Sequence, residues 1–189
     1  MASRAEQRWA RRVTGHPGDE KRRIVILGGG FAGVYTAMGL ERAMSAAERR
    51  RVEIALVSLE NYIVFQPLLP EVISGTLEML HAISPIRRLA KRTNLHTREI
   101  QGIDLERRVV TLGPEFQPKT KELPFDHLVI ALGSRLNYDL VPGMREHAIP
   151  FRYLGDAHRL RNALVQVLEE ADNEPDPAER RRLLTFVVA

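Results

Sequence analysis

The chain has 189 residues, of which 44% are apolar and 28% charged, and it contains no cysteine. This composition is typical of a soluble globular protein with one domain, or with one domain and part of another. The lack of cysteine excludes a disulfide framework, a thiolate metal site and a cysteine nucleophile. The six histidines are scattered without close ligand spacing, so we predict no metal site.

The formal net charge of +4 is confined to the amino-terminal end of the chain. Residues 1–23 carry seven basic and three acidic side chains, which account for the whole excess. The rest of the chain is formally neutral, which argues against binding to a nucleic acid backbone. We interpret residues 1–22 as a basic, disordered leader.

A glycine-rich motif organises the first part of the sequence. The apolar residues Ile24–Leu27 lead into Gly28, Gly29 and Gly30, and Gly33 opens an alanine-rich helical pattern. Gly28, Gly30 and Gly33 have the spacing of a dinucleotide-binding fingerprint, in which they serve the turn, the approach of a pyrophosphate and helix packing. The pyrophosphate would lie at the helix amino terminus near Phe31. The alternative is a glycine-rich turn in an ordinary strand–helix unit.

The helix is expected over residues 31–47, and a second, parallel strand over Val52–Val57. Dinucleotide-binding units usually place an acidic residue after this strand, where it accepts the ribose hydroxyls. Here Ser58 follows the strand, and Glu60 lies two residues further on. A neutral serine binds a ribose more weakly than a carboxylate does. The sequence leaves open whether Ser58 or Glu60 makes the contact.

The remaining sequence alternates loops with further predicted elements. The apolar stretch 60–77 contains Pro67 and Pro70, which forbid a regular helix between them, and it is predicted to line a ligand. Strands are expected over Thr97–Ile103, Arg108–Leu112 and residues 125–132. A helix is expected from Asp156 as its N-cap, and a second from Pro177. Residues 183–188 are expected to start another buried strand.

Three stretches together resemble the type II NADH dehydrogenases, which are flavoproteins that pass electrons from NADH to a membrane quinone without pumping protons. They are the glycine motif from Arg23 to Gly33, the segment Asn61–Pro70 with Ser74–Leu77, and Val129–Ser134. The resemblance runs from about Arg22 to the last residue. It implies an α/β fold, a Rossmann-like FAD-binding domain with a central parallel sheet and a small antiparallel excursion.

The resemblance also implies a set of FAD contacts. The pyrophosphate would be held near Gly28, Gly30, Phe31, Ala32 and Gly33, and the adenosine ribose near Ser58, Leu59 and Glu60. The isoalloxazine ring would lie near Gln66, Pro67 and Leu68. The backbone at Ile100 would lie near the adenine, and Ala131, Leu132 and Gly133 would lie against the cofactor.

The function implied by the resemblance is hydride transfer from NADH to FAD and onward transfer of electrons to a quinone. Residues 23–155 would form the first part of the FAD-binding domain, and residues 156–189 the start of an NADH-binding domain that lies mostly beyond the sequence. We expect the 189-residue chain alone to be inactive. In the full-length enzyme we expect peripheral association with the inner, cytoplasmic face of the cell membrane, with a homodimer as an option.

Two alternatives to this function stay open. One is a nucleotide-binding module without activity of its own. The other is a related flavin:quinone oxidoreductase with another electron donor, such as sulfide. Sulfide enzymes rely on cysteines near the flavin, and residues 64–70 contain none.

Overall fold

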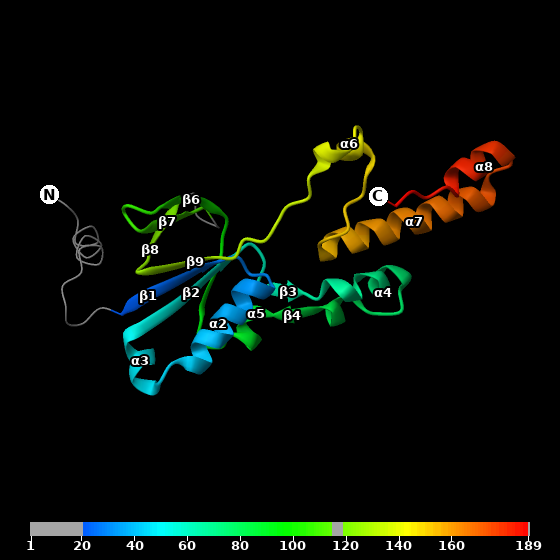
Figure 1. Cartoon of the computed structure of the whole chain (residues 1–189). Helices are drawn as coiled ribbons and strands as arrows, with labels where there is room; N and C mark the ends of the chain where they lie inside the picture. Colours follow the sequence, from blue (N-terminus) through cyan, green and yellow to red (C-terminus); the bar gives the residue numbers. More distant parts are fainter. Residues whose placement is uncertain (1–20, 115–118, 189) are drawn as a thin grey trace. The chain divides into compact units, whose positions relative to one another are not determined.

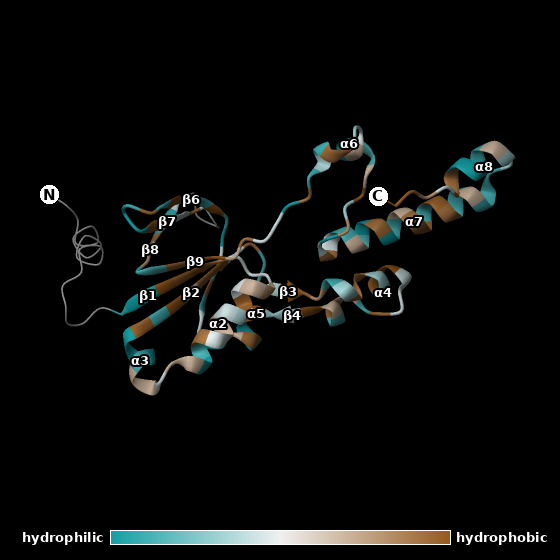
Figure 2. Cartoon of the chain, in the orientation of Figure 1, coloured by the Kyte–Doolittle hydropathy of each residue, from teal (hydrophilic) through white to brown (hydrophobic). Residues whose placement is uncertain are grey.

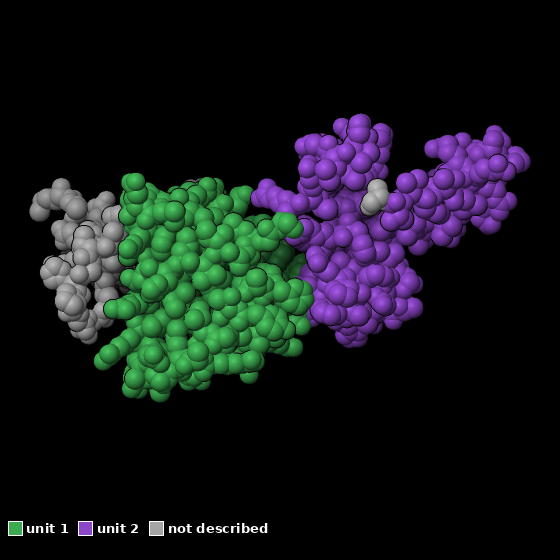
Figure 3. All heavy atoms as spheres, viewed as in Figure 1, with its two compact units in different colours: residues 1–63, 84–134 green, residues 64–83, 135–189 purple. Residues whose placement is uncertain are grey.

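A computed structural model describes residues 21–114 and 119–188 of the chain. Most of the predicted basic leader therefore lies outside the described residues. The chain divides into two compact units, which are coloured in Figure 3. Unit 1 comprises residues up to 63 together with 84–134, and unit 2 comprises residues 64–83 together with those from 135 onward. The predicted domain boundary at residue 155 stays a prediction.

Unit 1 is built on a parallel sheet of four strands, shown in Figure 1. Its strands are β1 (Arg22–Leu27), β2 (Val52–Ser58), β5 (Asn94–Thr97) and β9 (His127–Ile130). The spatial order is β5-β2-β1-β9, and every neighbouring pair is parallel. The α/β fold with a central parallel sheet is therefore confirmed.

Both faces of the two central strands are buried, as the apolar runs in β1 and β2 require. Figure 2 shows the apolar residues along the two strands. On one face, Ile26 and Leu56 pack with Val34 and Ala37 of α2 (Phe31–Ala43) and with Ile86 of α5 (Ile86–Leu89). The side chains that alternate with them face the other way and pack against a second sheet.

The second sheet is antiparallel and has three strands in the order β6-β7-β8. They are β6 (Ile100–Asp104), β7 (Val109–Leu112) and β8 (Lys121–Pro124). The predicted antiparallel excursion is thus confirmed, but its first strand begins at Ile100 and not at Thr97 as predicted. Thr97 belongs to β5 of the parallel sheet, where it pairs with Ser58. The strands β5 and β8 were not predicted, because each has only four residues with mixed polarity.

The first helix of unit 1 ends at Ala43 and does not reach Ala47 as predicted. A separate short helix, α3 (Ala46–Arg51), begins after Ser45. The Ser45 side chain accepts a hydrogen bond from the Glu48 backbone at 3.3 Å, and Glu48 Oε2 accepts one from the Ser45 backbone at 2.7 Å. This reciprocal capping box starts a new helix at the point where the long helix was expected to continue.

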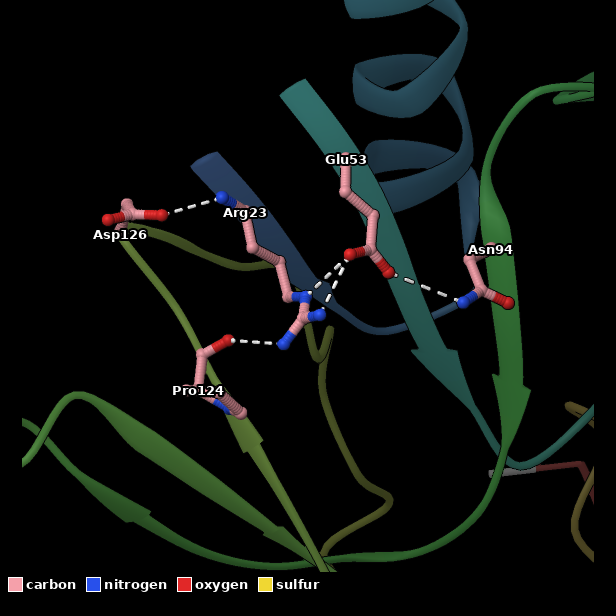
Figure 4. A network of polar contacts seen from close by, with 5 residues as sticks. All are labelled: Arg23, Glu53, Asn94, Pro124 and Asp126. Carbon is pink, nitrogen blue, oxygen red and sulfur yellow. Dashed lines mark hydrogen bonds and ion pairs between the residues drawn. The ribbon is translucent and has the colours of Figure 1, made fainter. Parts of the chain in front are cut away.

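At the amino-terminal ends of the parallel strands, Arg23 connects three segments by hydrogen bonds, as Figure 4 shows. Its guanidinium donates to Glu53 Oε2 at 2.8 and 3.0 Å and to the Pro124 carbonyl at 3.3 Å. Its backbone amide donates to Asp126 at 2.6 Å. Burial alone would raise the pKa of Glu53, but the hydrogen bond and charge of Arg23, helped by Asn94 and His96, leave that pKa below its ordinary value.

Unit 2 consists of several short elements and one long helix. The chain passes between the units at β3 (Tyr62–Val64) and β4 (Ile83–Pro85), which form a two-stranded sheet. The short elements are the 3-10 helices η1 (Gln66–Leu68), η2 (Met79–Ala82) and η3 (Tyr138–Leu140) and the helices α4 (Leu69–Ser74), α6 (Met144–His147) and α8 (Pro177–Leu183). The long helix is α7 (Leu154–Asn173).

The core of unit 2 lies where α4 packs on the start of α7. Leu69 and Val72 of α4 are buried with Ala82, Leu154 and Ala157. The side chain of Arg161 reaches the carboxyl end of α4, where its Nη1 donates to the Val72 carbonyl at 3.4 Å. In residues 21–114 and 119–188, no helix is both long enough and apolar enough to cross a bilayer.

Two predictions for unit 2 are wrong in detail. Asp156 is not the N-cap of α7: the helix begins at Leu154, and the Asp156 carboxylate accepts hydrogen bonds from the Arg152 and Tyr153 backbones at 3.0 and 2.7 Å. The expected buried strand after residue 183 is absent from the described residues. Leu183 instead ends α8, and Val187 and Val188 are 87% and 98% exposed. A strand forms only where another strand pairs with it, and apolar residues alone do not supply that partner.

Candidate nucleotide-binding site

The turn after β1 is held tightly between two neighbouring strands. The Gly28 amide donates to the Val57 carbonyl, and the Ala131 amide donates to the Leu27 carbonyl, each at 2.8 Å. Gly28 has a φ of +109°, and a Cβ added to it would lie 2.2 Å from the Ala131 carbonyl oxygen. Both the backbone angle and the close approach require glycine here.

The helix that follows lies equally close to this turn. A Cβ added to Gly33 would lie only 1.8 Å from the Gly28 carbonyl oxygen, so no other residue allows α2 to pack at this distance. This is the third role expected of the fingerprint, namely close packing of the helix on the strand.

Gly30 differs from these two glycines because the space beside it is open. No atom lies within 4 Å of a Cβ added to Gly30. Gly30 is the N-cap of α2, no described side chain caps this helix end, and the first helical turn has no acidic residue. The positive end of the helix dipole and its amide groups therefore face a space that an anion can enter.

The topology of the sheet places this space where α/β proteins bind ligands. The chain leaves β1 toward β2 and β5 on one side and returns to β9 on the other side. Ligands of open α/β sheets bind at the carboxyl ends of strands where the strand order reverses in this way. Here that position lies between Gly28, which follows β1, and Ala131, which follows β9.

Residues 58–60 lie at the neighbouring strand end but are not equivalent. Ser58 is 8% exposed, and a Cβ added to Gly29 would lie 2.1 Å from its Oγ. Leu59 is 71% exposed, and Glu60 is exposed as well. The pKa of the Tyr62 phenol is raised by burial first, and then by the charge of Glu60 and a hydrogen bond to it.

The other predicted residues of unit 1 lie after β9 and at the start of β6. Ala131, Leu132 and Gly133 follow β9 directly. Leu132 is 54% exposed, and Gly133 has a φ of +72°. Ile100 begins β6, pairs with Leu112 and packs against the core between the two sheets.

Gln66, Pro67 and Leu68 belong to unit 2 and form the 3-10 helix η1. The Gln66 side chain donates to the Arg152 carbonyl at 3.2 Å, and Leu68 packs against the core of α4 and α7. The predicted residues thus divide between the two units, with Gln66, Pro67 and Leu68 in unit 2 and the others in unit 1.

Sequence reasoning gave no separate role to Gly29. It fills the middle of the turn, where an added Cβ would lie 2.1 Å from Ser58 Oγ. The run of three glycines was a signal for Gly29, since the fingerprint itself requires only Gly28 and Gly30 in that run.

The strand order, the glycine turn and the open helix end together define an α/β dinucleotide-binding unit. Residues 22–183 match the family model of the pyridine nucleotide-disulphide oxidoreductases. The chain therefore belongs to the pyridine nucleotide-disulphide oxidoreductase family.

Individual relatives agree with the resemblance seen in the sequence. The chain is 31% identical to the external alternative NADH-ubiquinone oxidoreductase of Yarrowia lipolytica, over 89% of this chain and 29% of that protein. It is 34% identical to the type II NADH:quinone oxidoreductase NdhA of Mycobacterium tuberculosis, over 89% of this chain and 34% of that protein. The chain thus spans about a third of the length of these relatives.

A solved structure of NDH2 from Plasmodium falciparum in complex with NADH matches with a TM-score of 0.70 and 25% identity. The match covers 82% of this chain and 31% of that one. The sulfide:quinone oxidoreductase of Aquifex aeolicus matches with a TM-score of 0.64 at 23% identity, which shows a shared fold.

Proposed function

We propose that the chain is the FAD-binding part of a type II NADH:quinone oxidoreductase. The observation that carries this proposal is the open space at Gly30, bounded by the closely packed Gly28 and Gly33 at the end of β1. A pyrophosphate fits such a space because it needs backbone amides, a positive helix end and no side chain in the way. The identity to relatives named as NADH:quinone oxidoreductases supports FAD, NADH and quinone as its cofactor and substrates.

Each part of the site has a role in this proposal. Gly28, Gly30 and the first turn of α2 with Phe31 and Ala32 would hold the pyrophosphate, while Gly33 keeps the helix in place. The segments at Ser58–Glu60 and Ile100 would face the adenosine half. Ala131–Gly133 would lie along the cofactor, with Gln66–Leu68 near its ring. When bound, the flavin supplies the redox chemistry, and the protein positions it and shields it from water.

The remaining proposals concern the setting of the enzyme. A quinone substrate is lipid-soluble, so we place the activity at the inner, cytoplasmic face of the cell membrane through peripheral association. A homodimer stays a prediction, and so does the assignment of residues 156–189 to the start of an NADH-binding domain.

Flavin content tests the proposal directly. The purified chain should bind added FAD in an equimolar complex, detected as quenching of flavin fluorescence. A chimera tests the activity: residues 22–188 replace the matching segment of the Mycobacterium tuberculosis NdhA protein, to which they are 34% identical. The chimera should contain FAD and oxidise NADH with a quinone. A folded chimera that contains FAD but passes no electrons from NADH to a quinone would contradict the assignment.

A further inference from the structure

Positive charge is concentrated in unit 1 at the amino-terminal ends of β2 and β5, where the end of α2, the helix α3 and the turn after α5 meet. Residues 41–51 and 91–92 carry six basic side chains and two acidic ones, although residues 24–189 as a whole are formally neutral. All six basic side chains except that of Arg49, which is half-buried, are exposed. We refer to these six as the basic surface: Arg42, Arg49, Arg50, Arg51, Lys91 and Arg92.

Hydrogen bonds of Glu41 hold the three segments of the basic surface together. Glu41 Oε1 accepts from the Arg92 backbone amide and from Thr93 Oγ1, each at 2.8 Å. The Glu41 backbone carbonyl accepts from Arg49 Nη2 of α3 at 3.0 Å. One residue near the end of α2 therefore connects both neighbouring segments, and the cations are gathered by contacts within unit 1.

The basic surface lacks balancing negative charge. None of its six side chains forms an ion pair with another residue of 21–114 and 119–188. Besides Glu41, the carboxylate of Glu48 accepts from a backbone amide, and those of Glu53 and Asp126 both bind Arg23 (Figure 4). Cations held close together repel one another, and an anionic partner relieves that repulsion.

The composition of the basic surface favours the carboxylates of a protein. Five of its six side chains are arginines, and the planar guanidinium group binds a carboxylate through two parallel hydrogen bonds. Arginine is enriched in protein–protein interfaces, whereas lysine is depleted there. Residues 41–51 and 86–93 contain no aromatic side chain on which a nucleic acid base could stack.

The position of the basic surface argues against a lipid bilayer as its partner. The strands β1, β2 and β5 are parallel, so the basic surface at their amino-terminal ends and the glycine turn after β1 lie at opposite ends of these strands. A bilayer on the basic surface would turn the candidate nucleotide site of unit 1 away from the membrane that holds a quinone. A protein bound there leaves the glycine turn accessible.

We propose that the basic surface is a docking site for a protein partner, and that this partner presents a carboxylate-rich face to it. The inference goes beyond the proposed function, and it does not depend on FAD binding by the chain. It assigns a binding role to α3 and to the turn at residues 91–92, neither of which contributes to the candidate nucleotide site.

A binding experiment with a labelled polyglutamate peptide tests the proposal. The purified 189-residue chain should bind the peptide, measured by fluorescence anisotropy, and binding should weaken as the salt concentration rises. Arg50→Glu combined with Lys91→Glu should weaken binding at least about tenfold, because both substitutions place like charges opposite the peptide. The matched control is Arg180→Glu combined with Arg181→Glu. It makes the same change of net charge at exposed positions of α8, and it should change affinity less than about twofold.

Variants of Glu41 separate a defined surface from a simple effect of net charge. Glu41→Ala removes the acceptor for Arg92 and Thr93 and adds one positive charge, and it should weaken peptide binding about threefold because the segments separate. Glu41→Gln adds the same charge but keeps an oxygen acceptor, and it should bind at least as tightly as the wild type. Tighter binding by both variants would contradict the proposal.

Unfolding temperatures and two other anions complete the test. Arg50→Glu combined with Lys91→Glu should unfold at or above the wild-type temperature, since it relieves repulsion, so a loss of binding would not reflect loss of fold. The proposal is wrong if the wild type does not bind the peptide at low salt, or if the two double variants lose equal affinity. It is also wrong if the Arg50 and Lys91 substitutions weaken binding to phosphatidylglycerol vesicles or duplex DNA but not to the peptide. No measurement here uses flavin, so a chain that binds the peptide but no FAD would refute only the proposed function.

Discussion

The two units differ in how completely they bury their apolar side chains. In unit 1, Val25, Ile26 and Leu27 of the central strand are 0% exposed, and each face of the sheet is covered by a different layer. In unit 2, Leu69 and Val72 are buried, but Leu140 is 74% exposed and Val165 and Leu168 on α7 are each about half exposed. The comparison indicates that the central strands of unit 1 lie in a closed core, whereas the long helix of unit 2 leaves apolar side chains exposed.

The difference matters for function because the candidate site depends on the well-packed unit. Its geometry comes from backbone groups fixed between strands, and the main contacts are the Gly28–Val57 and Leu27–Ala131 hydrogen bonds. A binding site made of backbone atoms is as rigid as the core beneath it. The following predictions test this contrast, from the largest expected effect to the smallest.

The close packing of α2 on the glycine turn should be the most sensitive feature of unit 1. Gly33→Ala places a Cβ where the Gly28 carbonyl now lies, and it should lower the free energy of unfolding by about 3 kcal/mol. FAD affinity should fall with it, because the turn must move. Chemical denaturation and flavin titration measure the two effects.

Gly39→Ala is the matched control on the same helix. Nothing lies within 4 Å of a Cβ added there, so alanine should stabilise the chain by roughly 0.5–1 kcal/mol through its higher helix propensity. Equal effects of the two substitutions would contradict the packing argument.

The polar network of Arg23 at the amino-terminal ends of the strands should contribute to stability and not to FAD binding. Arg23→Ala leaves the Glu53 carboxylate without its main partner, and it should cost about 2 kcal/mol of unfolding free energy. FAD affinity of the folded variant should stay unchanged, because Arg23 lies at the start of β1 and the glycine turn follows the end of this strand. A loss of affinity together with the loss of stability would show that the two ends of the strand are coupled.

The same network predicts a pH dependence. The pKa of Glu53 is lowered in the folded protein, so its contribution to stability is present above the unfolded pKa of about 4.3 and is lost as the pH falls through the folded value. Unfolding measured across this acid range should show a weaker pH dependence for Arg23→Ala than for the wild type.

In unit 2, the contact of Arg161 with α4 should have a smaller effect. Arg161→Ala removes the hydrogen bond to the Val72 carbonyl and the guanidinium group that lies next to Gly75. It should lower the free energy of unfolding by about 1 kcal/mol. Hydrogen exchange should rise in residues 69–76 and stay unchanged in β1 and β2. Faster exchange in the strands would mean that the two units do not respond independently.

The smallest expected effect concerns His96 on β5. Its Nε2 is buried and has no hydrogen-bond partner in the described part of the chain. Burial, followed by the charge of Lys121, lowers its pKa, with further lowering by Arg23 and Arg98 and opposition from Glu53. The unfolded chain therefore binds this proton more readily, so stability should fall as the pH drops below about 6.5. His96→Gln should flatten this part of the stability profile.

Much of unit 1 was predictable from the sequence because its signals are local. The run Ile24–Leu27 before the glycines specified β1, the turn and the start of α2, and residues 52–57 specified β2. The short strands β5 and β8 carry no such pattern, since their pairing is decided by neighbours distant in the sequence. The end of α2 was readable in principle, because Ser45 and Glu48 have the spacing of a capping box.

The site itself was predictable only in part. The fingerprint gave the roles of Gly28, Gly30 and Gly33, because those roles follow from spacing. The burial of the Ser58 side chain next to Gly29 depends on side-chain directions at a strand end, which periodicity does not determine. The exposed residues 184–188 show the same limit, since apolar sequence favoured a strand whose pairing the sequence did not reveal.

The most direct test of the central claim is FAD binding by the wild type and by Gly30→Val. A Cβ added at this position meets no protein atom within 4 Å, and the valine side chain would extend into the space proposed for the pyrophosphate. We expect the wild type to bind FAD, and the variant to unfold at a similar temperature and lose most of its affinity. Equal FAD affinity in the two proteins would contradict the account.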